Sequence, residues 1–267
     1  VHTITKAQDR EGITPFDLEV LQVLYMIKGI KEVPATITNL TTLLIGSIES
    51  IKKDVENEVR HSLLRLQKAI LIQKNADQTF TFLSNDEQEI QREVEHTRIN
   101  EANLDAKLAR EFFNEIYSAS RVMYRNLPFD FNKQFNGYIR GTALHEMTLY
   151  VVTREMTEEE ARLQSHSGLA IMRIPDELAE TFEEPLRYAE RLETYLRVKN
   201  FPAAEPYDQI RRNLQEQRGE FDQEARRKLV EACREATFYI NGKDYTFSGN
   251  VEHQVEQALL KLVENTF

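Results

Sequence analysis

The sequence has one cysteine among 267 residues, and it is also poor in glycine and proline. A single cysteine, Cys233, excludes a disulfide framework and any zinc site that is built from several cysteines. Nine glycines and seven prolines disfavour a β-sandwich, a Rossmann domain and an active site made of loops. No apolar run reaches about 18 residues, and no signal-peptide pattern opens the chain, so we expect a cytoplasmic protein without a membrane partner.

Positive charge is also in short supply, because 34 basic residues face 44 acidic ones, for a net charge of −10. The chain as a whole is therefore not attracted to nucleic acid or to an anionic membrane, and contact with either needs a local basic patch. A hydrophobic fraction of 41% is typical of a globular protein, and the length suffices for two domains. The chain begins with Val1 rather than Met, and we expect it to be a piece of a longer protein.

The sequence motifs of common catalytic and cofactor sites are missing. Gly242-Lys243 is followed by Asp244, so it is not the end of a P-loop, and no H-E-x-x-H motif occurs. The six histidines include no pair at i, i+4 spacing, which disfavours a metal site. Cys233 lies near two alanines on a charged helix, where a small buried residue is expected rather than a reactive thiol. We therefore expect a non-enzyme with no catalytic, cofactor-binding or metal-binding residue.

Residues 1–83 predict a winged helix-turn-helix domain, which consists of three helices followed by a β-hairpin. Thr14 is placed to cap the first helix, Pro15 occupies its first position, and Gly29 ends it. The second and third helices are expected over 38–48 and 52–69. Two β-prone runs, 70–74 and 79–83, flank a polar turn and form the expected hairpin.

The remainder predicts a helical connector over 84–119 and a mixed α/β domain over 120–267. Ser84 begins the connector as a helix cap. In the last domain we expect strands over 144–152 and 169–175, long helices over 176–200 and 207–236, and a final helix over 251–263. Asn241-Gly242 is a strong hairpin signal, while 124–141 reads as a loop. The fold class is thus α+β and mostly helical, with a winged helix followed by a helix-rich α/β arm.

The third helix and the hairpin supply the candidate DNA contacts, because such a helix often lies in the major groove while the hairpin contacts the backbone. The candidates are Lys52, Lys53, Arg60, His61, Arg65, Lys68 and Lys74. In the helix, five lysines and arginines face three carboxylates, a weaker basic stripe than a dedicated DNA reader has. Packing or protein docking and duplex DNA binding therefore both stay open.

A second group of residues interleaves aromatic rings with cations. Its members are Tyr124, Phe129, Phe131, Phe135 and Tyr138, with Arg121, Arg125, Lys133 and Arg140. This pattern occurs in stacking surfaces for single-stranded nucleic acid. More often such a cluster is the core seam of a loop-rich subdomain, and the sequence favours that interpretation over stacking.

Several stretches resemble the BREX (bacteriophage exclusion) family of P-loop proteins called BrxC or PglY. They are FDLEVL at 16–21 with the helix onward to Lys28, NLTTL at 39–43, LIQKN at 71–75, FLSNDEQEI at 82–90, EIY at 115–117, NLPFD at 126–130, and the Asn241-Gly242 hairpin. The resemblance covers most of the chain. It rests on short similar stretches of sequence and includes no catalytic motif.

This resemblance implies a segment downstream of the ATPase core of a large AAA+-type protein in bacterial phage defence. ATP and Mg²⁺ are expected for the full-length family protein, but its nucleotide-binding motifs have no counterpart here. Other BREX proteins are the implied partners, and a homo-oligomer and duplex DNA stay open. We expect a non-catalytic accessory region that serves oligomerisation or partner docking. The alternative is a winged-helix DNA-binding module, as in origin-recognition ATPases, which the arrangement resembles.

Overall fold

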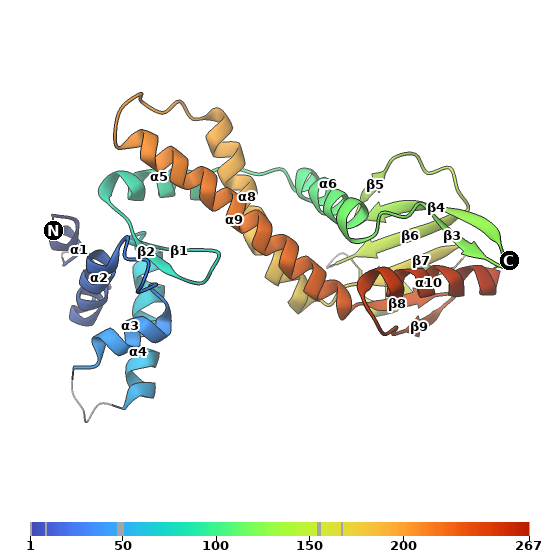
Figure 1. Ribbon diagram of the computed structural model, residues 1–267, viewed down its shortest axis with the longest axis horizontal. Coiled ribbons are helices and arrows are strands. Elements are labelled where there is room, and N and C mark those ends of the chain that lie inside the picture. The colour runs from blue at the N-terminus through green and yellow to red at the C-terminus, as the bar shows by residue number, and fades with distance from the viewer. Residues whose placement is uncertain (1, 9, 47–50, 154–155, 167, 267) are drawn as a thin grey trace. The chain divides into compact units, whose positions relative to one another are not determined.

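The computed structural model describes residues 2–8, 10–46, 51–153, 156–166 and 168–266 (Figure 1). Their contacts divide the chain into two compact units. Unit 1 comprises Val1–Arg98 and Arg191–Phe221, and unit 2 comprises Ile99–Glu190 and Asp222–Phe267. The sequence predicts boundaries at 83 and 119 instead, with everything after 119 in one domain. The difference arises because the stretch 191–221 packs with the N-terminal residues.

Unit 1 is mainly helical and contains one small hairpin. Its elements are α1 (His2–Gln8), α2 (Pro15–Ile27), α3 (Ile37–Leu44), α4 (Lys52–Lys68), β1 (Ile72–Lys74), β2 (Phe80–Phe82), α5 (Asn85–Glu95), the last turns of α8 (Asp176–Val198) and the first half of α9 (Tyr207–Arg234). The order predicted for residues 1–83, three helices and then a hairpin, is present in α2 to β2. The helix α1 precedes it and was not expected.

Two helix starts confirm the predicted caps. The Thr14 side chain accepts a hydrogen bond from the backbone of Asp17, whose carboxylate accepts one from the backbone of Thr14, which is a complete capping box. Ser84 and Glu87 form the same reciprocal pair at α5. Helix α3 ends at Leu44, sooner than the predicted 48, and 47–48 lie outside the described residues.

The core of unit 1 gathers the inner faces of α2, α3 and α4 on the hairpin. Its buried side chains include Val20, Leu21, Leu24, Leu40, Val59, Leu63, Leu66, Leu71, Ile72, Phe80 and Phe82. In the antiparallel hairpin, Ile72 lies opposite Phe82. Burial of these apolar side chains is the main stabilising term for a unit of this size.

Unit 2 is built on a mixed sheet. Its elements are α6 (Glu101–Glu111), the π-helix η1 (Phe112–Ile116), β3 (Arg121–Tyr124), β4 (Leu127–Phe135), β5 (Tyr138–Arg140), β6 (Met147–Val152), α7 (Glu158–Gln164), β7 (Leu169–Arg173), β8 (Thr237–Ile240), β9 (Lys243–Tyr245), α10 (Val251–Thr266) and the adjoining parts of α8 and α9. The strand order is β3-β4-β6-β7-β8-β9, with β5 paired to β4. The β4–β6 and β6–β7 pairs are parallel, and the others are antiparallel.

The two faces of this sheet have different covers. One face packs into the large core of unit 2, in which Phe131, Phe135, Leu149, Met172 and Phe238 meet side chains of α6, α8, α9 and α10. On the other face, α7 covers a smaller cluster that centres on β6, β7 and β8. Figure 1 shows α6 and α10 running beside the sheet.

Most of the elements predicted after residue 140 are present. The strands β6 and β7, the helices α8 and α9 and the β8–β9 hairpin all lie within the predicted segments. Helix α10 begins at the predicted Val251 and ends three residues after the predicted Val263. Asn241 and Gly242 both have positive φ, as a two-residue hairpin turn requires. The loop predicted over 124–141 is wrong, because most of that segment forms β4 and β5.

Candidate functional site

The outer face of α4 carries most of the residues that the sequence identifies as DNA contacts. Five of them have exposed side chains: Lys52, Lys53, Arg60, His61 and Lys68. One side of the helix presents the positions that recur at helical spacing, which are 53, 57, 60, 61, 64 and 68. Helical geometry therefore brings most of the predicted residues together on one surface.

Arg65 has a different role from its neighbours, because it is bound to a carboxylate in the core of unit 1. Its Nε donates to Oδ2 of Asp17 at 2.9 Å, and its Nη2 donates to Oδ1 at 2.7 Å. The Asp17 side chain is fully buried. Burial alone would raise the pKa of Asp17, but hydrogen bonds from Arg65 and Thr14 outweigh it and hold the pKa below its usual value. This pair joins α2 to α4 and occupies the guanidinium.

Carboxylates also lie among the other cations of α4. Arg60 makes an exposed i, i+4 ion pair with Glu56 at 2.6 Å. Beside it, Asp54 and Glu58 line an open hollow of about 610 Å³ together with His61 and the start of α2. A phosphate that approached this side of α4 would meet negative charge, so the helix is not a continuous basic surface.

An apolar side chain lies in the middle of the same outer face. Leu64 is 64% exposed and sits one turn from both Arg60 and Lys68. Sequence reasoning missed it because Leu64 neighbours the buried Leu63 and Leu66 and was not assigned a side of the helix. Protein interfaces combine an apolar centre with a polar rim, and the exposed Leu64 between two cations has that arrangement.

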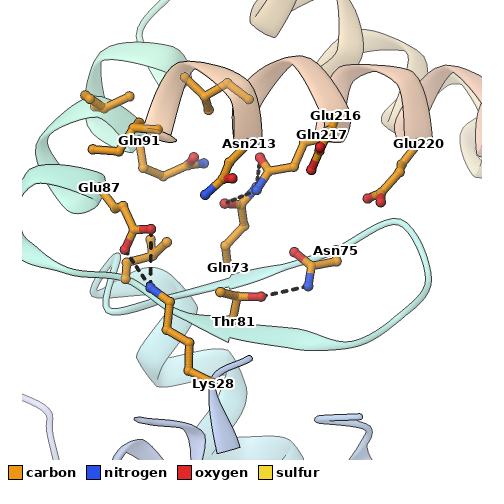
Figure 2. Close-up of a pocket in the computed structure, with 14 residues that line it drawn as sticks. Lys28, Gln73, Asn75, Thr81, Glu87, Gln91, Asn213, Glu216, Gln217 and Glu220 are labelled. Atoms are coloured by element: carbon orange, nitrogen blue, oxygen red, sulfur yellow. Dashed lines mark hydrogen bonds and ion pairs between the residues drawn. The ribbon is translucent and has the colours of Figure 1, made fainter. Parts of the chain in front are cut away.

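The hairpin is covered on one side by α9. Figure 2 shows Gln73 of β1 pointing at Gln217, and the two amides exchange hydrogen bonds at 3.0 and 3.4 Å. Lys74, the candidate contact on the hairpin, is exposed. Because the amide pair fixes the hairpin to α9, the hairpin is not a free wing on that side.

A polar pocket of about 240 Å³ lies between the hairpin, α5 and α9 within unit 1 (Figure 2). At one end, Lys28 donates to both oxygens of Glu87, at 2.9 and 3.2 Å. At the other end, burial raises the pKa of Glu220, and the carboxylates of Asp77 and Glu216 raise it further. The lining is rich in amides, which suits water or a polar side chain better than an apolar ligand.

The Gly242-Lys243 pair is not part of a phosphate-binding loop. Gly242 lies in the β8–β9 turn and Lys243 begins β9, and the Gly242 N–H donates to the Ser165 hydroxyl at 3.1 Å. A phosphate cradle needs a glycine-rich loop that leads into a helix, and this turn leads into a strand. Within the described ranges no group of three or more His, Cys, Asp or Glu side chains could hold a metal ion.

Two further sequence interpretations can be judged from burial. Cys233 is fully buried, and that burial raises the pKa of its thiol, which confirms a buried residue rather than a reactive one. Of the five aromatic residues at 124–138, Phe131 and Phe135 belong to the core of unit 2, so they are not available for stacking. Tyr138 differs, because it is 40% exposed. None of the helices in the described part of the chain is long and apolar enough to cross a membrane.

Comparison with known proteins assigns the chain to a family. Residues 97–262 match the family described as "BREX ATP-binding protein BrxC 4th domain with six-stranded beta sheet". The chain belongs to the BREX BrxC family. The match covers most of unit 2 together with residues 191–221 of unit 1, and it confirms the resemblance noted in the sequence. The sheet of unit 2 runs β3-β4-β6-β7-β8-β9, and β5 is a seventh strand paired to β4. No solved structure matches the chain.

Membership in the BrxC family makes this chain a component of BREX phage defence. The description names an ATP-binding protein, and it places the matched segment as a fourth domain. That position agrees with a segment downstream of the ATPase core.

Proposed function

We propose that this BrxC-family chain is a non-catalytic accessory region that docks other BREX proteins through the outer face of α4. The observation that carries the proposal is the exposed Leu64 at the centre of that face. Arg60 and Lys68 provide a polar rim one turn away on either side. An apolar anchor surrounded by charged side chains is the usual anatomy of a protein interface.

Charge supports docking over DNA binding at this surface. Arg65 is occupied by Asp17, and Arg60 is paired with Glu56. Each phosphate contact contributes mainly through counterion release, so the three lysines and His61 would give weak and salt-sensitive binding. The nearby carboxylates Asp54 and Glu58 reduce it further.

The experiment is a pulldown of the other proteins of the same BREX system with this chain as bait, with and without nuclease. We expect one of them to be retained in both conditions, because the contact is between proteins. Loss of retention after nuclease treatment would mean that DNA bridges the two. In parallel, the chain alone should release no phosphate from ATP, and hydrolysis by a pure sample would overturn the non-catalytic assignment.

A second function is favoured by the order of the elements in unit 1. Helices α2, α3 and α4 followed by the β1–β2 hairpin have the order of a winged helix, and a domain of that type would present α4 to the major groove. The triple change of Lys53, Arg60 and Lys68 to alanine tests this function, because each side chain is exposed. Duplex binding at low salt that this variant loses would support it. Absence of binding by the unmodified chain would exclude it.

A further inference from the structure

A basic hollow lies on unit 2, at the edge of the sheet where β5 is added to β4. It has a volume of about 630 Å³ and is open to solvent. Strands β4 and β5 contribute Lys133, Tyr138 and Arg140, and the end of α6 contributes Arg110. The loop between β5 and β6 contributes His145. Residues 30 positions apart in sequence thus meet at one place, which is why no sequence motif reveals the hollow.

The charge in this hollow is of one sign. Arg110, Lys133 and Arg140 line it, and no described lining residue carries a carboxylate. Lys133 and Arg140 lie directly opposite each other in the β4–β5 ladder, an arrangement of like charges that destabilises a strand pair. Burial lowers the pKa of Lys133, and the charge of Arg140 lowers it further. In a chain with ten surplus negative charges, this concentration of positive charge is unusual.

In the part of the chain that the structure describes, Arg110 and Arg140 lack the ion pairs that occupy other arginines of unit 2. Arg187, Arg226 and Arg227 each bind at least one carboxylate. Among the described residues, neither Arg110 nor Arg140 has such a partner. Their guanidinium groups are therefore available to an anion, for which their fork of N–H donors is well suited.

The walls of the hollow are held in place by hydrogen bonds. The buried Asn132 side chain accepts from the backbone N–H groups of Leu144 and His145, at 2.9 and 3.0 Å, and donates to the His145 carbonyl at 2.7 Å. The Lys133 ammonium donates to the Ser118 carbonyl at 2.9 Å. The π-helix η1 provides another wall, and π-helical turns occur often at functional sites. The hollow is a built feature of unit 2 rather than a gap between mobile side chains.

We propose that this hollow binds the phosphate backbone of a nucleic-acid strand. The two free guanidinium groups and the Lys133 ammonium would contact phosphate oxygens, which are the ligands that arginine forks prefer. The exposed ring of Tyr138 offers a surface on which a base can stack, and it distinguishes a nucleic acid from an acidic polypeptide. The hollow is also the local basic patch that an acidic chain needs in order to approach nucleic acid at all.

The test is fluorescence anisotropy with the whole 267-residue chain, a labelled single-stranded oligodeoxynucleotide and the matching duplex, over a salt series. The variant Arg110→Gln/Arg140→Gln removes the two arginines of the hollow. Arg234→Gln is the matched control, because Arg234 is an exposed arginine on α9 that does not line the hollow. Circular dichroism spectra establish that each variant is folded.

We expect the double variant to bind the single strand at least about tenfold more weakly, and its slope of log K against log salt to shrink by about 1.4, at about 0.7 for each lost contact. Arg234→Gln should bind like the unmodified chain. Tyr138→Ala should weaken binding of the single strand more than binding of the duplex, because paired bases are not free to stack.

Four results would overturn the proposal. The first is absence of oligonucleotide binding at low salt, and the second is binding by the double variant equal to that of the unmodified chain. The third is competition by poly-glutamate as effective as competition by an oligonucleotide of equal charge. The fourth is tighter binding of ATP than of the oligonucleotide at the same residues. The triple α4 variant with Lys53, Arg60 and Lys68 changed to alanine should retain this binding, which separates the hollow from the outer face of α4.

Discussion

Arg65 holds the buried carboxylate of Asp17 through two hydrogen bonds that join α4 to α2, at 2.9 and 2.7 Å. The aspartate caps its own helix at the same time, since its Oδ2 accepts from the Thr14 N–H at 2.8 Å. One carboxylate thus fixes both the start of α2 and the position of α4. Arg65, which the sequence identifies as a candidate DNA contact, thus forms a structural link within unit 1.

Replacement of Arg65 by glutamine should destabilise unit 1 by about 3 kcal/mol, because the loss of one partner leaves a buried charge without compensation. Arg60→Gln is the matched control, since it breaks an exposed i, i+4 pair on the same helix that is worth about 0.3–0.5 kcal/mol. Urea unfolding followed by circular dichroism measures both. Equal midpoints for the two variants would mean that the Asp17 pair does not stabilise the fold.

Acid should reduce the contribution of the same pair. The pKa of Asp17 is lowered in the folded chain, so ionised Asp17 contributes stability that is fully present above about pH 4, the unfolded value. That contribution is lost as the pH falls through the lower folded pKa. The difference in unfolding free energy between the unmodified chain and Arg65→Gln should therefore be largest at neutral pH and shrink in acid. A difference independent of pH would contradict this.

Glu220 should behave in the opposite way, because its pKa is raised by burial, Asp77 and Glu216. A raised pKa means that the ionised carboxylate destabilises the folded chain, and the penalty appears as the pH rises through the folded pKa. Glu220→Gln should therefore raise the melting temperature at neutral pH and have little effect in acid. Glu235→Gln is the control, because Glu235 is exposed and directly follows the last residue of α9. A lower melting temperature for Glu220→Gln at neutral pH would refute this.

Short sequence motifs correctly predicted a helix start and a hairpin turn. The capping box at Thr14 and the Asn241-Gly242 turn depend on residues within four positions of each other, and both are present. The segment 124–141 was misread because Pro128 and Asn126 are typical of loops, although Phe129, Phe131 and Phe135 keep the two-residue period of a strand.

Contacts between distant segments could not be predicted. The amphipathic pattern of α9 defines an apolar side but does not name its partner, so the packing of Gln217 on Gln73, 144 residues away, was not foreseen. The same limit applies to the surfaces. The sequence does not show that Arg65 is paired with Asp17, because the two residues lie on different helices. It does not show the basic hollow either, because the hollow forms through the pairing of β5 with β4. Leu64 could have been found from the spacing of α4 alone, because it falls between Arg60 and Lys68.

The most direct test of the docking function compares Leu64→Asp with Leu163→Asp in a pulldown of the other proteins of the same BREX system. Both leucines are exposed, at 64% and 68%, so neither change disturbs a core, and Leu163 lies on α7 of unit 2. The docking function predicts that Leu64→Asp loses the retained protein, because a carboxylate replaces the apolar anchor, while Leu163→Asp keeps it. Retention by Leu64→Asp equal to that of the unmodified chain would contradict the proposed role of α4.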